Sequence, residues 1–308
     1  MRAHGIMFHH FHGNGHIETQ GSINDVELDQ LIHWLNSQFN LLNADHWLAK
    51  CISGTLKERD ICLTFDDGLK CQYDVALPVL EAYSIKAFWF VYTAPVLGVP
   101  CSLELYRHFR HSCFEQIDDF YEAFDTHYQS SGFDEQIKTK LHDFDSRLYL
   151  AHAVFYTDGD RKFRFIRDQI LGPKNYELLM DSMMSQYNFS VERERANLWI
   201  NEQGLKKIQL QGHIIGLHSH THPTRLHHLS AKQQHDEYSK NMSCLNSIIG
   251  TEILAMSHPC NSYNDDTLRI LRDLGIQVGF CSNMEGTRDG DLEMPREYHT
   301  DLMKRLKQ

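Results

Sequence analysis

The chain has 308 residues and a hydrophobic content of 42%, which is enough to bury the core of one large domain or of two small ones. Its formal net charge of −11 and its scattered Lys and Arg residues argue against a nucleic-acid partner, because phosphate neutralisation requires clustered cations. No apolar run is long enough for a membrane span, and none precedes His9 and His10 that would serve as a signal peptide, so we expect a cytoplasmic protein.

The first third of the chain alternates short apolar runs with segments of helical periodicity. The run "ICLTF" is typical of a buried strand, and it stops at Asp66-Asp67-Gly68. A strand, a helix and a second buried strand in this order favour a parallel α/β arrangement. The expected elements are strands over 6–11, 61–65 and 87–92 and helices over 23–39 and 73–83.

A long middle segment breaks this alternation. From about residue 101 to 205 the chain is rich in charged and aromatic residues at helical spacing, which predicts a helical insertion with an aromatic core. The alternation then resumes, so we expect a single domain over 1–308 with a barrel-like α/β fold that carries this insertion. The later expected elements are strands over 213–217, 253–257 and 278–281 and helices over 230–249 and 265–274.

Two adjacent carboxylates, Asp66 and Asp67, follow a predicted buried strand. The carboxyl ends of parallel strands are where α/β folds gather active-site groups. Adjacent residues at a strand end point in different directions, so one Asp can bind a metal while the other faces a substrate. The alternative is an ordinary turn, for which Asp-Gly is a common dipeptide.

A second group of polar residues lies in the segment "GLHSHTHP". On an extended strand His218, His220 and His222 share a face, whereas on a helical turn only His218 and His222 do. Both geometries bring His218 and His222 together, which is a common start to a divalent metal site that a carboxylate completes. The alternative is a solvated, histidine-rich loop in a chain with 21 histidines.

Taken together, the motifs "TFDDG", "HSHTHP" and "SHPCNSYND" resemble those of the polysaccharide deacetylases of carbohydrate esterase family 4, which are similar to nodulation protein B. The resemblance covers residues 62–93 and about 200–264, and leaves the insertion and the chain ends unmatched. It implies a deformed (β/α) barrel with about seven parallel strands. It also implies a divalent metal ion, namely zinc, with cobalt or nickel as alternatives.

The resemblance also implies roles for individual residues. Asp66 matches the catalytic base, and Asp67, His218 and His222 match the three metal ligands. The backbone N–H of Cys260, the residue after the third-motif proline, matches the donor to the oxyanion. His220 occupies an unspecified position and is expected to line the site rather than bind the metal.

Two family features have no direct match. Many members carry an Arg where this chain has Ser257, and Arg296 in "MPREYH" is a candidate replacement; a surface ion-pairing Arg is the alternative. The late motif that supplies the general acid is absent, so His299 is a candidate by its order along the chain alone. At the end of the first predicted strand, His9 or His10 could approach the substrate or the metal, or be structural.

The resemblance implies a metal-dependent N-deacetylase that acts on an amino sugar. Because no secretion signal is evident, we expect a small-molecule or lipid-linked N-acetyl sugar, a cytoplasmic precursor in surface-polysaccharide or glycoconjugate biosynthesis. One alternative keeps the metal site but changes the reaction to deformylation or O-deacetylation of a sugar. Another is a catalytically silent carbohydrate-binding protein, against which the intact Asp66 argues.

Overall fold

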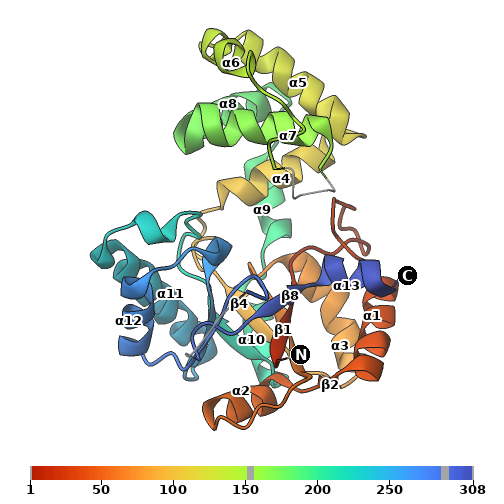
Figure 1. Cartoon of the computed structure of the whole chain (residues 1–308), viewed down its shortest axis with the longest axis vertical. Helices are drawn as coiled ribbons and strands as arrows, with labels where there is room; N and C mark the ends of the chain where they lie inside the picture. The colour runs from red at the N-terminus through yellow and green to blue at the C-terminus, as the bar shows by residue number, and fades with distance from the viewer. Residues whose placement is uncertain (1, 151–155, 286–290, 307–308) are drawn as a thin grey trace. The chain divides into compact units, whose positions relative to one another are not determined.

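The computed structural model describes residues 2–150, 156–285 and 291–306 (Figure 1). The chain forms two compact units: the first combines Met1–Cys101 with Arg195–Gln308, and the second is Ser102–Glu194. The second unit contains most of the insertion expected at about 101–205, whereas residues 195–205 belong to the first unit. None of the helices described is both long and apolar enough to cross a membrane.

The first unit is built on a parallel sheet. Within the described residues, seven strands follow the order β7-β6-β5-β4-β3-β1-β8, and β2 pairs with β3. Helices alternate with the strands, so the prediction of a deformed (β/α) barrel with a helical insertion is confirmed. The strands are β1 (His4–Phe8), β2 (Asn40–Leu41), β3 (Asp60–Phe65), β4 (Phe88–Val91), β5 (Ile214–Leu217), β6 (Ala255–Ser257), β7 (Val278–Phe280) and β8 (Arg296–Tyr298).

The central strands are buried along their whole length, as their continuous apolar runs predict. Aromatic rings stack across them, with Phe65 5.2 Å from Phe8 and 4.6 Å from Trp89 between ring centroids. At Gly216 a Cβ atom would lie 2.5 Å from the carbonyl oxygen of Ala255, so only glycine allows β5 and β6 to approach this closely. The core thus fixes the strand ends from which the polar side chains project.

Four helices of the first unit, α1, α10, α11 and α12, begin at residues whose side chains cap them. Asn24, Ser230 and Asn264 each form a capping box with the residue three positions later. The helix expected over 73–83 starts as a π-helical segment, and α2 and α13 were not predicted. The helical segments are α1 (Asp25–Gln38), α2 (Ala44–Ile52), η1 (Gln72–Ala76), α3 (Leu77–Ala82), α10 (Glu202–Leu210), η3 (Leu226–His228), α11 (Ala231–Ile249), η4 (Pro259–Asn261), α12 (Asp265–Asp273) and α13 (His299–Leu306).

The second unit is helical and has a hydrophobic core of its own. Its aromatic residues, among them Phe109, Phe120, Phe124 and Phe163, are buried against one another, as the aromatic stripe in the sequence predicts. The helix α9 (Val191–Leu198) contains the boundary with the first unit. The other helical segments are α4 (Ser102–Ser112), α5 (Ile117–Gln129), α6 (Asp134–Leu141), α7 (Asp158–Phe165), η2 (Ile166–Leu171) and α8 (Gly172–Gln186).

Candidate active site

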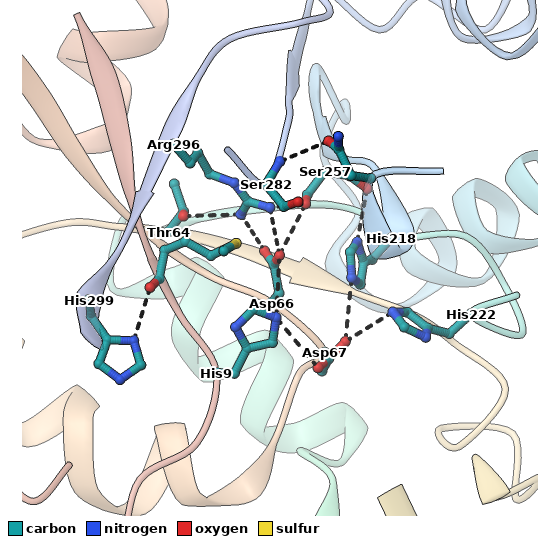
Figure 2. A network of polar contacts seen from close by, with 12 residues as sticks. His9, Thr64, Asp66, Asp67, His218, His222, Ser257, Ser282, Arg296 and His299 are labelled. Atoms are coloured by element: carbon teal, nitrogen blue, oxygen red, sulfur yellow. Dashed lines mark hydrogen bonds and ion pairs between the residues drawn. The ribbon is translucent and has the colours of Figure 1, made fainter. Parts of the chain in front are cut away.

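Asp66 and Asp67 directly follow β3, at the edge of the sheet where the parallel strands end. Asp67 has a φ of 76° and Gly68 a φ of 62°, so the chain turns sharply in the left-handed region. At Gly68 a Cβ atom would lie 3.0 Å from a methyl group of Val91. This turn sends the two carboxylates in different directions, as Figure 2 shows: Asp66 faces Arg296, and Asp67 faces two histidines.

Those two histidines are His218 and His222, which follow the end of β5. The Nε2 atom of each lies 3.4 Å from Oδ1 of Asp67 (Figure 2). One ligand atom from each of the three residues lies within 4.8 Å of the other two. The Nδ1 atom of His218 donates to the carbonyl oxygen of Ser257 at 2.9 Å, which directs Nε2 toward Asp67.

The donor set fits a divalent metal ion. Oδ1 of Asp67 is buried and has no hydrogen-bond partner in the part of the chain that the structure describes. Burial opposes ionisation of Asp67, but the nearby imidazoles of His218, His222 and His9 hold its pKa well below the usual range. An ionised carboxylate between two imidazoles, with space for water and substrate, is a typical catalytic metal site.

His220 lies outside this cluster. Its Nδ1 contacts the hydroxyl of Thr93 at 2.9 Å, and its backbone N–H donates to Glu237 at 2.9 Å. The same carboxylate accepts hydrogen bonds from the N–H and the hydroxyl of Thr221. His220 therefore helps to hold the loop that carries His218 and His222.

Two residues that hold this loop were not found from the sequence. Glu237 and Asn241 lie on α11, one turn apart, and Oδ1 of Asn241 accepts the backbone N–H of His218 at 2.9 Å. The Nδ2 atom of Asn241 donates to the carbonyl oxygen of Val91 in the neighbouring strand. Their i, i+4 spacing on a long helix is common, so it carried no signal for this role.

We expect His222→Ala to abolish stable metal binding and His220→Ala to leave it nearly intact. His222 supplies a nitrogen to the cluster, whereas the ring of His220 contacts the hydroxyl of Thr93. Zinc affinity of the two variants, measured by competition with a chromogenic chelator, tests this. A loss of zinc affinity in His220→Ala as large as that in His222→Ala would assign His220 to the metal instead.

Asp66 is the centre of a buried polar network. Arg296 donates two parallel hydrogen bonds to its carboxylate, from Nη1 to Oδ1 and from Nη2 to Oδ2, and both are 2.7 Å long. Arg296 also donates to Ser257 Oγ at 2.7 Å, and Ser257 Oγ lies 3.2 Å from Asp66. Burial favours the neutral acid, but the charges of Arg296 and His218 lower the pKa of Asp66.

The guanidinium group of Arg296 is fixed on every side. It is fully buried, with Nε donating to the carbonyl oxygen of Cys281 at 2.6 Å. The rings of Phe90 and Phe280 each lie 5.9 Å from its Cζ atom. The alternative of a surface ion-pairing Arg is therefore wrong: Arg296 contacts the carboxylate of Asp66 (Figure 2).

His9 approaches both carboxylates from the end of β1. Its Nε2 lies 3.8 Å from Asp66 and 4.0 Å from Asp67, and its Nδ1 has no hydrogen-bond partner in the described residues. Because β1 pairs in parallel with β3, with Phe8 opposite Phe65, the next residues of both strands meet at one edge. The expected strand over 6–11 in fact ends at Phe8, which frees His9 to turn toward this edge.

The contacts of His299 do not favour the general-acid role that is predicted for it. Its Nδ1 lies 3.1 Å from the carbonyl oxygen of Met7 and its Nε2 2.9 Å from that of Gly21, so both ring nitrogens are engaged by the backbone. The ring is buried and stacks on Phe8. Burial lowers the pKa of His299 as it lowers that of His9, so the contacts of the two rings, and not their pKa values, distinguish them.

Cys260 lies in the turn after β6, where Cys260 and Asn261 have φ values of 51° and 54°. Desolvation by surrounding atoms and the negative charge of Asp67 raise the pKa of the Cys260 thiol to about 12. The Cys260 side chain is exposed, and its sulfur is not among the ligand atoms that cluster with Asp67. This agrees with a role for its backbone N–H rather than for its sulfur, which stays a prediction.

Three solved structures of similar fold illustrate the likeness of this chain to known proteins. The deacetylase PplD of Streptococcus pyogenes in complex with acetate has a TM-score of 0.54 at 16% identity, over 97% of this chain and 92% of that one. A de-N-acetylase from Aggregatibacter actinomycetemcomitans has a TM-score of 0.56 at 15% identity, over 99% and 100%. IcaB from Ammonifex degensii has a TM-score of 0.54 at 14% identity, over 96% and 91%.

The sequence comparisons point the same way. No curated protein matches the chain significantly. The family model described as polysaccharide deacetylase matches residues 53–100 and 172–279, about half of the chain, and these ranges include both the carboxylate and the histidine motifs. The chain therefore belongs to the polysaccharide deacetylase family.

Proposed function

We propose that the protein is a metal-dependent hydrolase that removes the N-acetyl group of an amino sugar. Family membership supports a carbohydrate deacetylase. The observation that carries the finer proposal is the pairing of Asp66 with Arg296 beside the cluster of Asp67, His218 and His222. A base held ionised next to a three-ligand site is the arrangement that acyl hydrolysis by water requires.

Asp67, His218 and His222 would hold a divalent ion, which we propose to be zinc, with cobalt or nickel as alternatives. Such an ion would supply Lewis-acid chemistry, which polarises a carbonyl and acidifies water. Asp66 accepts the proton of the attacking water through a carboxylate oxygen, and Arg296 holds that carboxylate in place. The backbone N–H of Cys260 is our candidate donor to the carbonyl oxygen as negative charge develops there.

We assign the general-acid role to His9 in place of His299. Its ring faces both carboxylates and is partly accessible to solvent, with 23% of the side chain exposed. Neither ring nitrogen of His9 hydrogen-bonds to a backbone carbonyl in the described residues, in contrast to His299. Burial lowers the pKa of His9 to about 4, although the charges of Asp67 and Asp66 oppose this shift, so its candidacy as the donor to the leaving amine rests on its position beside the carboxylates.

As substrate we propose a nucleotide-linked or lipid-linked N-acetyl sugar, a cytoplasmic precursor in the assembly of a surface polysaccharide or glycoconjugate. The similar de-N-acetylase supports an acyl group on nitrogen by its description alone. Formyl amides and O-acetyl esters carry a carbonyl that could be attacked in the same way. The released acid, acetate or formate, and the group left on the sugar, an amine or a hydroxyl, distinguish these reactions.

We expect the protein, stripped with a chelator and reloaded with zinc, cobalt or nickel, to release acetate from at least one conjugated N-acetyl sugar. The stripped form should be inactive, because the residues alone provide no Lewis acid. Release of formate instead would assign a deformylase. If the reloaded protein releases no acid from nucleotide-linked, lipid-linked or free N-acetyl sugars, the protein is a catalytically silent carbohydrate-binding protein. Equal rates of acetate release from chitin oligomers and from the conjugated sugars would refute a small precursor as substrate.

A further inference from the structure

Three arginines lie close together in the helical unit. Arg110 on α4 and Arg167 on η2 place their guanidinium carbons 5.3 and 6.0 Å from the centre of the Phe163 ring. Arg164 follows Phe163 on α7, and both its charge and that of Arg167 act on Arg110. We refer to Arg110, Arg164 and Arg167 as the arginine cluster.

The cluster holds more positive than negative charge. Asp168 pairs with Arg167, at 2.6 Å to Nε and 2.9 Å to Nη2. Arg110 and Arg164 have no carboxylate within ion-pair distance among the described residues, and the Nε atom of each is buried without a hydrogen-bond partner there. Burial lowers the pKa of Arg110, and the charges of Arg164 and Arg167 lower it further.

The aromatic contacts do not satisfy these groups. Arg110 lies over Phe163 and Phe120, and Arg164 over Tyr156 at 4.0 Å. A ring face attracts a cation, but it accepts none of the in-plane N–H donors of a guanidinium. Both side chains are partly buried, and their buried Nε–H donors therefore point to no acceptor in the described residues. Such an arrangement costs free energy unless an anion binds.

The chemistry of the cluster favours a phosphoryl group over other anions. The guanidinium fork matches two oxygens of a phosphate, and a phosphoryl group carries a charge of about −1.5 to −2 at pH 7, which balances two unpaired arginines. The backbone next to Arg164 is also unusual. It continues from α7 into the π-helical segment η2, and π-helical turns occur often at functional sites.

We propose that Arg110 and Arg164, with Arg167 beside them, bind a phosphoryl group in the helical unit. The site does not rest on the proposed deacetylase reaction. Nucleoside diphosphates and sugar 1-phosphates both carry the required group. Either could be the natural ligand, and the two are separated by their affinities.

Calorimetric titration of pyrophosphate into the full-length protein tests the site. The protein is first stripped of metal, so that no metal ion holds the anion, and the ionic strength is kept constant. We expect saturable binding that Arg110→Gln and Arg164→Gln each weaken by about tenfold or more, since each removes a charge-assisted contact. Arg147→Gln is the matched control, because Arg147 is 85% exposed and paired with Asp145.

Absence of saturable binding, or equal binding by the wild type and both Gln variants, would overturn the proposal. Equal affinity for citrate would overturn its selectivity for phosphate. If a Gln variant misfolds by near-ultraviolet circular dichroism, Arg164→Lys keeps the charge without the fork and should bind more weakly than the wild type. Parallel titrations with a nucleoside diphosphate and with an amino-sugar 1-phosphate identify the natural ligand. It is the one of the two that binds more tightly than pyrophosphate.

Discussion

Replacing Asp66 with Asn is expected to slow acyl release by about 10²–10⁴-fold, the usual contribution of a general base. The amide has nearly the same shape as the carboxylate but cannot take a proton from water. The three proposed metal ligands are untouched, so metal content should stay at the wild-type level. Initial rates with reloaded metal, together with metal analysis of the same sample, separate the loss of the base from the loss of the ion.

The matched control is Asp45→Asn on α2, whose side chain is 60% exposed and remote from the network. Its rate should equal that of the wild type. Unchanged turnover in Asp66→Asn would remove Asp66 from the mechanism. A variant that lost its metal as well would show that Asp66 helps to hold the ligand cluster, and the slow rate would then say nothing of a base.

The parts of this site that could be predicted are those written in short motifs. Asp66 and Asp67 end a continuous apolar run, and His218 and His222 follow another, so both pairs had to lie at the carboxyl edge of one parallel sheet. Spacing alone left His220 undecided between a ligand and a wall residue. Its contacts with Thr93 and Glu237 settle its place outside the cluster.

What the sequence could not provide is pairing between distant segments. Arg296 and Asp66 are 230 residues apart, and no local pattern distinguishes a buried Arg from an exposed one. The order of the strands explains why His299, rather than His9, was predicted as the general acid. Both β3 and β8 flank β1, so a residue after β1 or after β8 could reach the carboxylates. His299 begins α13 and turns to backbone carbonyls, whereas His9 takes the place beside Asp66.

Replacing Arg296 with Met is expected to lower the free energy of unfolding by about 3–5 kcal/mol, the usual cost of breaking a buried ion pair. The carboxylate of Asp66 would be left buried without its cationic partner, with the hydroxyl of Ser257 at 3.2 Å and Nε2 of His9 at 3.8 Å. Turnover should also fall, by about a hundredfold, because the base would no longer be held in position. Denaturant unfolding of the metal-free protein and initial rates of the reloaded protein measure the two effects.

The control is Arg305→Met, since Arg305 pairs with Glu297 at a partly exposed site and such pairs contribute about 0–1 kcal/mol. Arg296→Lys keeps the positive charge but cannot form the bidentate hydrogen bonds to Asp66, so its turnover rate should lie between those of the wild type and of Arg296→Met. The double variant Asp66→Asn/Arg296→Met removes both charges. Because the cost of each single change is mainly the unpaired partner, the double variant should be less destabilised than the sum of the two. Additive costs would mean that the two side chains, despite their 2.7 Å contacts, are energetically independent.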